Sequence, residues 1–131
     1  MCPTDKRVLF VEDDMHFREY IEDVVAPKFD VDVVCCERSS QADKRLEEEP
    51  FDAAILDVRV TNGNGVSLYK KIMQRWPSLQ VIFLTGYDST HLREEIEHIG
   101  PARIYSKDSM MKPMFFESLM AQIGVQRRSV A

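Results

Sequence analysis

The chain is poor in the residues that mark disulfide-bonded, fibrous and low-complexity proteins. Its three cysteines, Cys2, Cys35 and Cys36, are an odd number without metal-ligand spacing. Adjacent strand residues point to opposite faces of a sheet, so Cys35 and Cys36 do not easily serve one site. We expect reduced thiols, at least one of them in the core. Five glycines and six prolines among 131 residues are too few for a collagen-like or disordered chain.

Long apolar runs and clustered positive charge are also missing. No run approaches the roughly 20 residues that span a bilayer, and the N-terminal MCPTDKR lacks the apolar region of a signal peptide. A net charge of −5 is unlike a nucleic-acid binder, which needs a basic stripe. The only basic cluster, Arg127 and Arg128, lies in a tail that we expect to be frayed. The sequence predicts a cytoplasmic protein that binds neither nucleic acid nor membrane through this domain.

The length of the chain suits one domain, and five apolar runs of strand length alternate with segments of helical period. Runs that are apolar throughout are typical of strands buried on both faces of a parallel sheet. We therefore predict an α/β fold with a five-stranded parallel sheet sandwiched by five helices. The single domain spans 1–131, with its core at about 6–124. The predicted strands are 8–11, 31–36, 53–56, 81–84 and 102–106.

The segments between these strands carry apolar residues at the 3.6-residue period of amphipathic helices. Serine and aspartate favour helix N-termini, whereas proline and glycine end helices, and Asp14 is the expected cap of the first helix. The predicted buried faces are Phe17, Ile21, Val24 and Val25 before Pro27; Ala42 and Leu46 after a cap at Ser39 or Ser40; Val66, Tyr69, Ile72, Met73 and Trp76 before Pro77; Leu92, Ile96 and Ile99 before Gly100; and Leu119, Met120 and Ile123.

Polar residues follow four of the five predicted strands, at the edge where open α/β sheets bind ligands. Carboxylates a few ångströms apart repel by about 1 to 4 kcal/mol per pair, so a cluster of them needs a compensating charge. A divalent cation such as Mg2+ supplies that charge and leaves positions for phosphate oxygens. The residues in question are Glu12, Asp13 and Asp14 after the first strand, Asp57 after the third, Thr85 after the fourth and Lys107 after the fifth.

This set of side chains suits phosphoryl transfer. Asp57 is the predicted nucleophile, because a carboxylate can form an aspartyl-phosphate. Thr85 and Lys107 offer a hydroxyl and an ammonium to the arriving phosphoryl oxygens. Taken singly, Asp57 also reads as a turn residue and Lys107 as a solvated surface charge. Their joint placement at one sheet edge favours the functional interpretation.

Four separated motifs, in order and with characteristic spacing, resemble the receiver domain of two-component response regulators, including chemotaxis regulators. They are VEDD at 11–14, AAILDV at 53–58, VIFLTG at 81–86 and IYSKD at 104–108. The resemblance covers nearly the whole chain. It implies a flavodoxin-like doubly wound fold and a phosphorylation-dependent switch in a two-component phosphorelay, with no enzymatic activity beyond self-phosphorylation and self-dephosphorylation.

The resemblance also implies a role for each site residue. Glu12, Asp13, Asp57 and the main-chain carbonyl of Arg59 hold Mg2+ or Mn2+. Asp57 accepts a phosphoryl group from a sensor histidine kinase or a phosphotransfer protein, assisted by Thr85 and a lysine. The change then shifts the face formed by the fourth helix, fifth strand and fifth helix, which binds a downstream protein partner.

The chain departs from the family pattern at several positions. Thr61 stands where the family usually has proline. The switch aromatic is replaced by Ile104, with Tyr105 one residue later on the opposite face of the strand. Lys107 directly ends a predicted strand, but Lys112 precedes a proline, which is the commoner family form. We favour Lys107 as the site lysine.

Two other functions are alternatives. Ile104 and Thr61 favour a degenerate receiver, which would bind partners without phosphorylation. A haloacid-dehalogenase-type hydrolase also has a nucleophilic aspartate after a strand, but it typically carries a second aspartate two residues later, where this chain has Arg59. No output domain follows the fifth helix, so the sequence is either a single-domain regulator or a piece of a longer protein. About half of the apolar residues at 110–116 are expected to pack in the core, and the remainder to form a docking surface or a homodimer surface through the fourth-helix to fifth-helix face. These residues are Met110, Met111, Met114, Phe115 and Phe116.

Overall fold

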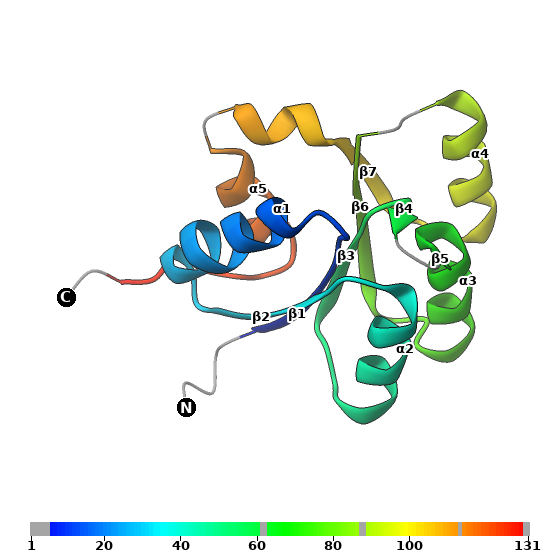
Figure 1. Ribbon diagram of the computed structural model, residues 1–131, viewed down its shortest axis with the longest axis horizontal. Helices are drawn as coiled ribbons and strands as arrows, with labels where there is room; N and C mark the ends of the chain where they lie inside the picture. Colours follow the sequence, from blue (N-terminus) through cyan, green and yellow to red (C-terminus); the bar gives the residue numbers. More distant parts are fainter. Residues whose placement is uncertain (1–5, 61–62, 87–88, 113, 130–131) are drawn as a thin grey trace.

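The computed structural model describes residues 6–60, 63–86, 89–112 and 114–129. Its main sheet has five parallel strands in the order β2-β1-β3-β6-β7, which confirms the predicted α/β fold (Figure 1). The strands are β1 (Lys6–Val11), β2 (Val31–Cys36), β3 (Ala53–Leu56), β6 (Gln80–Thr85) and β7 (Arg103–Ser106). The α-helices of the described chain are α1 (Met15–Tyr20), α2 (Ser39–Glu48), α3 (Gly65–Arg75), α4 (Thr90–Ile99) and α5 (Phe115–Gln122).

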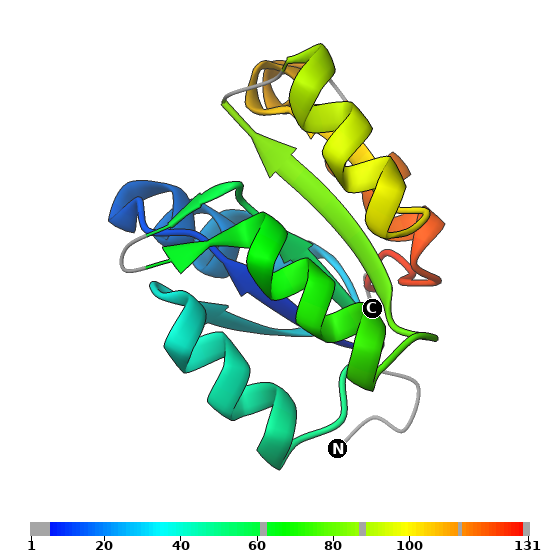
Figure 2. The same ribbon diagram turned by 90° about the vertical axis from the view of Figure 1, so that its right-hand side faces the viewer.

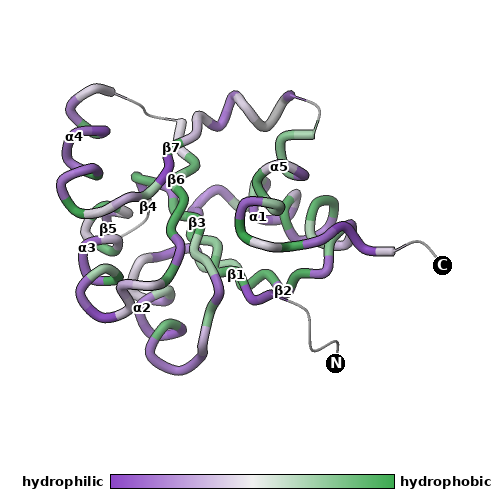
Figure 3. The backbone as a smooth tube through the Cα atoms, turned by 180° about the vertical axis from the view of Figure 1, so that it is seen from behind, coloured by the Kyte–Doolittle hydropathy of each residue, from purple (hydrophilic) through white to green (hydrophobic). Residues whose placement is uncertain are grey.

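The sheet separates two apolar clusters, one on each face. Along β1, Val8 and Phe10 face the cluster under α1 and α5, whereas Leu9 and Val11 face the cluster under α2, α3 and α4. Figures 1 and 2 show these two layers of helices on opposite sides of the sheet. The central strands are buried on both faces because successive side chains alternate in direction. Figure 3 shows the same arrangement as green strands inside purple-striped helices.

The first helix differs from the prediction in its second half. After α1 the chain continues as a π-helix, η1 (Ile21–Val25), and a 3-10 helix, η2 (Ala26–Lys28). The Ala26 N–H donates to the Ile21 carbonyl five residues earlier, so this turn is wider than an α-helical one. Val25 therefore follows Ile21 on the buried face, and Val24 is 41% exposed. The prediction that Val24 is buried was wrong.

The start of α2 is also not capped as predicted. Ser39 and Ser40 lie inside the helix, and Arg38 is the residue that precedes it. The Gln41 side-chain oxygen instead accepts the backbone N–H groups of Glu37 at 2.9 Å and Arg38 at 3.1 Å. The prediction of a serine cap was wrong because a side chain in the first turn reaches back to these donors.

The C-terminal tail is held against the body of the protein, contrary to the expectation of fraying. The Asp30 N–H donates to the Gln126 carbonyl and the Arg128 N–H to the Lys28 carbonyl, each at 2.8 Å. The Arg128 guanidinium lies 3.5 Å from an Asp30 carboxylate oxygen, and Val125 is buried. Phe29 and Arg127 form a short antiparallel bridge between the tail and the chain just before β2. The bridge gives partners to backbone groups that the main sheet does not use.

Several other sequence-based expectations have plain outcomes. Asp14 caps α1 through bonds to the N–H groups of His16 and Phe17, as predicted. Cys36 is buried, Cys35 is half-buried, and both are free thiols. Cys2 and Thr61 lie outside the described residues, as do the side chains of Met110 and Met111. None of the described helices is long and apolar enough to cross a membrane.

The buried hydroxyl of Tyr69 predicts a measurable stability effect. It accepts the Ala102 N–H at 3.0 Å, between α3 and the start of β7. We expect Tyr69→Phe to lower the free energy of unfolding by about 1 to 3 kcal/mol, because the Ala102 donor loses its partner. Urea unfolding measures the change. Tyr20→Phe is the control, because Tyr20 is 40% exposed, and equal effects of both substitutions would contradict the assignment.

Candidate functional site

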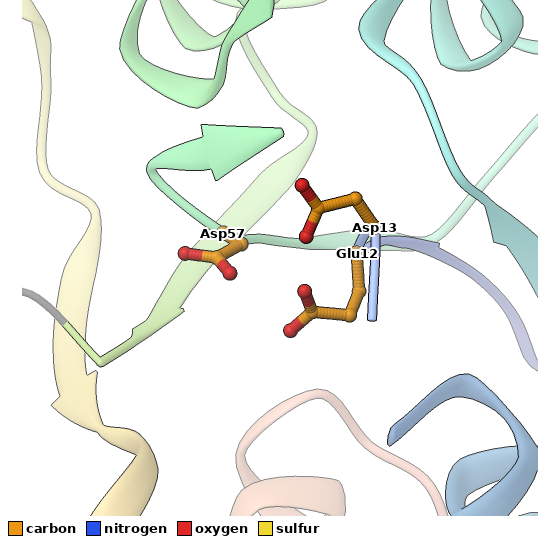
Figure 4. Close-up of side chains that lie close together, drawn as sticks. All are labelled: Glu12, Asp13 and Asp57. Atoms are coloured by element: carbon orange, nitrogen blue, oxygen red, sulfur yellow. The ribbon is translucent and has the colours of Figure 1, made fainter. Parts of the chain in front are cut away.

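The predicted acidic residues meet at the carboxyl edge of the sheet. Glu12 and Asp13 directly follow β1, and Asp57 directly follows β3. The Glu12 N–H donates to the Cys36 carbonyl at 2.9 Å and the Asp57 N–H to the Val11 carbonyl at 3.1 Å, so the ladders of the sheet fix both positions. One carboxylate oxygen from each of the three acids lies within 4.8 Å of the others (Figure 4). Glu12 and Asp57 are buried, whereas Asp13 is exposed.

Lys107 supplies the cation that faces this cluster. It follows β7 and begins the 3-10 helix η3 (Lys107–Met111). Its ammonium donates to Asp57 Oδ2 at 2.8 Å and pairs with Glu12 Oε1. The ammonium also lies 5.1 Å from the centre of the Phe17 ring, a cation–π distance. Lys112 is exposed at the end of η3, so the structure brings Lys107 to the acids.

The pKa values of this group reflect burial opposed by ion pairing. Burial raises the pKa of Glu12 to about 7, against the hydrogen bond from Lys107, and the negative charge of Asp57 adds to the rise. Burial alone would lower the pKa of Lys107, but its hydrogen bonds to Asp57 and Glu12 outweigh that effect and raise the pKa. Lys107 therefore stays cationic at neutral pH, where it compensates the negative charge of Asp57 and favours the ionised form of Glu12.

A short hairpin after β3 holds the second oxygen of Asp57. Its strands are β4 (Arg59–Val60) and β5 (Gly63–Asn64), which pair antiparallel. The Arg59 N–H lies 3.3 Å from Asp57 Oδ1. These two short strands were not predicted from the sequence. The role of the Arg59 carbonyl as a metal ligand stays a prediction.

Gly65 allows α3 to begin directly behind Asp57. Its N–H donates to the Val58 carbonyl at 2.9 Å, and Asn64 caps the helix by accepting the Val66 N–H at 2.7 Å. A Cβ atom at position 65 would lie 2.0 Å from the Asp57 carbonyl oxygen. Only glycine permits so close a backbone approach.

Thr85 and the residues near β7 complete the edge. Thr85 ends β6, is buried, and pairs in register with Ser106, the residue before Lys107. Ile104 is half-buried against the cluster under α2, α3 and α4. Tyr105 lies on the opposite face, as predicted, where its hydroxyl donates to Gln122 Oε1 at 3.0 Å.

Two contributors to the site escaped the sequence reasoning. Arg18 on α1 donates from Nη1 to the Glu12 carbonyl at 2.9 Å and so holds the turn that carries the acids. Phe17 was predicted only as a core residue, yet its ring lies beside the Lys107 ammonium. Neither contact has a sequence signal, because each depends on where the turn after β1 places the first helix.

The donor set fits a hard divalent cation. Glu12, Asp13 and Asp57 offer carboxylate oxygens alone, which suit Mg2+ or Mn2+ better than softer transition metals. A cluster from only three side chains leaves coordination positions for water and for phosphate oxygens. Asp57 thereby offers a carboxylate oxygen to a metal and lies beside the Lys107 ammonium.

The fold and this site place the chain among known proteins. The family model described as the response regulator receiver domain matches residues 8–123, so the chain belongs to the receiver domain family of two-component response regulators. Receiver domains of this family bind a divalent metal at an acidic pocket and work with kinases or phosphotransfer proteins and with effector domains.

Relatives with curated names differ in what they carry besides the receiver. The chain is 26% identical to the response regulator receiver protein CpdR of Brucella abortus, over 86% of this chain and 92% of that protein. It is 29% identical to the DNA-binding transcriptional activator DevR/DosR of Mycobacterium tuberculosis, over 92% of this chain but 55% of that protein. The chain thus spans nearly all of the first relative and about half of the second.

Solved structures support the fold. The signal receiver domain of an HD domain-containing protein from Pseudomonas fluorescens superposes with a TM-score of 0.78 at 21% identity, covering 92% of each chain. The BeF3-activated receiver domain of Klebsiella pneumoniae RstA gives a TM-score of 0.76 at 24% identity, covering 90% of this chain and 95% of that one.

The close approach at Gly65 predicts a selective effect of an added methyl group. We expect Gly65→Ala to destabilise the protein by about 1 to 3 kcal/mol or more, because the Asp57 backbone must move. Thermal unfolding measures the loss. Gly86→Ala is the matched control, since its Cβ would lie 3.9 Å from the nearest atom, Lys107 Cδ. A Gly65→Ala protein as stable as the control would refute the close approach.

Proposed function

We propose that the chain is a phosphorylation-dependent switch in which Asp57 accepts a phosphoryl group from a sensor histidine kinase or a phosphotransfer protein. The observation that carries the proposal is the pairing of a buried Asp57 carboxylate with the Lys107 ammonium, beside Glu12 and Asp13. An ion pair that only stabilised the fold would not need two further carboxylates within 4.8 Å.

The proposed step is a direct displacement at phosphorus. An Asp57 carboxylate oxygen attacks the phosphorus of a phosphohistidine on the donor protein. The new oxygen–phosphorus bond forms as the phosphorus–nitrogen bond breaks, and the imidazole leaves and takes up a proton. The Lys107 ammonium and the Thr85 hydroxyl bind phosphoryl oxygens as their negative charge shifts.

A bound Mg2+ or Mn2+ would neutralise charge on the phosphoryl oxygens and the carboxylates. Glu12, Asp13, Asp57 and the Arg59 carbonyl would hold it. Two contacts hold the turn that carries the acids. Arg18 donates to the Glu12 carbonyl, and Asp14 caps the start of α1. The protein would thus bring a largely preformed set of oxygen ligands to the metal.

The output of the switch is a change in partner binding. The family relatives include a DNA-binding transcriptional activator and a protein-glutamate methylesterase, so an effector domain or a separate downstream protein is the expected partner. Beyond self-phosphorylation and self-dephosphorylation we propose no enzymatic activity. We propose that the protein lies in the cytoplasm, because a histidine kinase takes its phosphoryl group from ATP and would find it there.

Phosphorylation of the intact chain tests this function. We expect intact-mass spectrometry to show one added phosphoryl group after incubation with Mg2+ and acetyl phosphate. The adduct should be absent from Asp57→Asn, which lacks the nucleophilic carboxylate, and absent when EDTA removes the metal.

The controls separate a failed switch from an unreactive donor. Asp52→Asn removes an exposed carboxylate at the opposite edge of the sheet and should leave the adduct intact. An adduct that persists in Asp57→Asn would reject Asp57 as the acceptor. Absence of both the adduct and Mg2+ binding would support the degenerate receiver that binds partners without phosphorylation.

A further inference from the structure

A chain of aromatic rings connects β7 to the outer surface of α1. Tyr105 packs edge-to-face on Phe115 with ring centres 5.8 Å apart, and Phe115 packs on Phe116 at 5.1 Å. Phe116 then contacts Tyr20 at 6.1 Å. These ring contacts run without interruption from β7 to the surface beside α1.

That surface carries a groove between α1 and α5, which lie on the same side of the sheet (Figure 1). The groove has a volume of about 310 Å3, and Tyr20, Phe115 and Phe116 lie along it. Tyr20 at 40% and Met114 at 70% exposure leave large apolar surfaces in water at its rim. These two exposed side chains line the same groove and could contact one bound segment together.

The backbone at Met114 adds to this picture. Met114 has φ of 66°, the one positive value for a non-glycine residue in the described chain. A left-handed conformation costs a side-chain-bearing residue roughly 1 to 2 kcal/mol. The fold therefore retains a strained residue whose apolar side chain is directed to solvent at the edge of the groove. Such strain recurs where proteins clamp a ligand.

The charges around the groove run against those of the whole protein. Lys28, Lys112 and Arg127 line it with a single carboxylate, Glu117, which pairs with Arg127. Lys28 and Lys112 form no ion pair within the part of the chain that the structure describes. The lining of this groove thus carries more positive than negative side chains, although the whole chain has a net charge of −5.

We propose that this groove, between α1, η2 and the start of α5, docks an acidic peptide segment of a partner protein that carries a large apolar side chain. The apolar side chain would lie on Tyr20, Phe116 and Met114, and its flanking carboxylates would meet Lys28 and Lys112. Charge complementarity selects this occupant, because a neutral or basic segment would leave both ammonium groups uncompensated.

The proposal goes beyond phosphorylation at Asp57 and shifts the predicted docking surface. The sequence placed it on the face of the fourth and fifth helices, from methionine and phenylalanine residues at 110–116. In the structure Phe115 and Phe116 pack toward α1, on the other side of the sheet from α4. The described apolar part of that segment therefore faces α1.

The test is selection from a random 12-residue peptide library displayed on phage, panned against the intact, unphosphorylated chain. We expect a consensus of Asp and Glu residues around one large apolar residue. A synthetic peptide of that consensus should lose at least tenfold in affinity, by fluorescence anisotropy, for the Lys28→Glu, Lys112→Glu double variant. That loss corresponds to about 1.4 kcal/mol or more of binding free energy.

Two further variants make the test specific. Lys44→Glu with Lys70→Glu changes the net charge equally on the opposite face, and should bind the peptide as the wild type does. Met114→Gly removes the apolar side chain and relieves the left-handed strain, so it should weaken binding without lowering the unfolding temperature.

Three results would overturn the proposal. One is a consensus without acidic residues, or no consensus at all. Another is equal affinity for the wild type and the Lys28→Glu, Lys112→Glu variant. The third is concentration-dependent dimerisation in analytical ultracentrifugation that this variant abolishes, which would make a second copy of the chain the occupant. Since no phosphodonor is present, none of these results bears on the acceptor role of Asp57.

Discussion

The contact on which the site depends is that of the Lys107 ammonium with the carboxylates of Asp57 and Glu12. Burying two carboxylates side by side is unfavourable, because each loses its hydration and each repels the other. Lys107 offsets both effects from the end of β7, which β3 and β6 separate from β1 in the sheet. The ammonium pairs with two of the three carboxylates that would hold a divalent cation. The protein alone therefore holds the site with one cation, and a bound metal would share or replace that role.

The parallel sheet makes this contact possible. Each strand of a parallel sheet brings its carboxyl end to the same edge, so residues far apart in the sequence meet without long loops. Asp57 and Lys107 are fifty residues apart, yet their side chains are 2.8 Å apart. Gly65 then lets α3 start against the Asp57 carbonyl, and Arg18 holds the turn after β1. Position at the site is thus set mainly by backbone hydrogen bonds of the sheet.

Sequence reasoning could predict the strands and the polar residues that follow them, because continuous apolar runs and strand-end acids are local patterns. It could not predict the exposure of Val24, since a π-helical turn changes the side-chain period without any residue that signals it. Nor could it predict the pairing of Gln126 and Arg128 with the chain before β2, which depends on backbone groups left free by the tertiary fold. The motifs alone left both Lys107 and Lys112 as candidates for the site lysine. The position of β7, which ends directly before Lys107, distinguishes them.

The most direct measurement of the central claim is the rise in unfolding temperature that saturating Mg2+ gives to the wild type and to Lys107→Met. A ligand that binds the folded state raises its stability according to its affinity. Without the ammonium, Lys107→Met should be less stable in EDTA and should gain more from Mg2+, because the metal no longer competes with Lys107 for Asp57 and Glu12. Lys112→Met, which alters an exposed lysine, should behave as the wild type does. A Mg2+ effect that is equal in Lys107→Met and the wild type, or absent from both, would contradict the account.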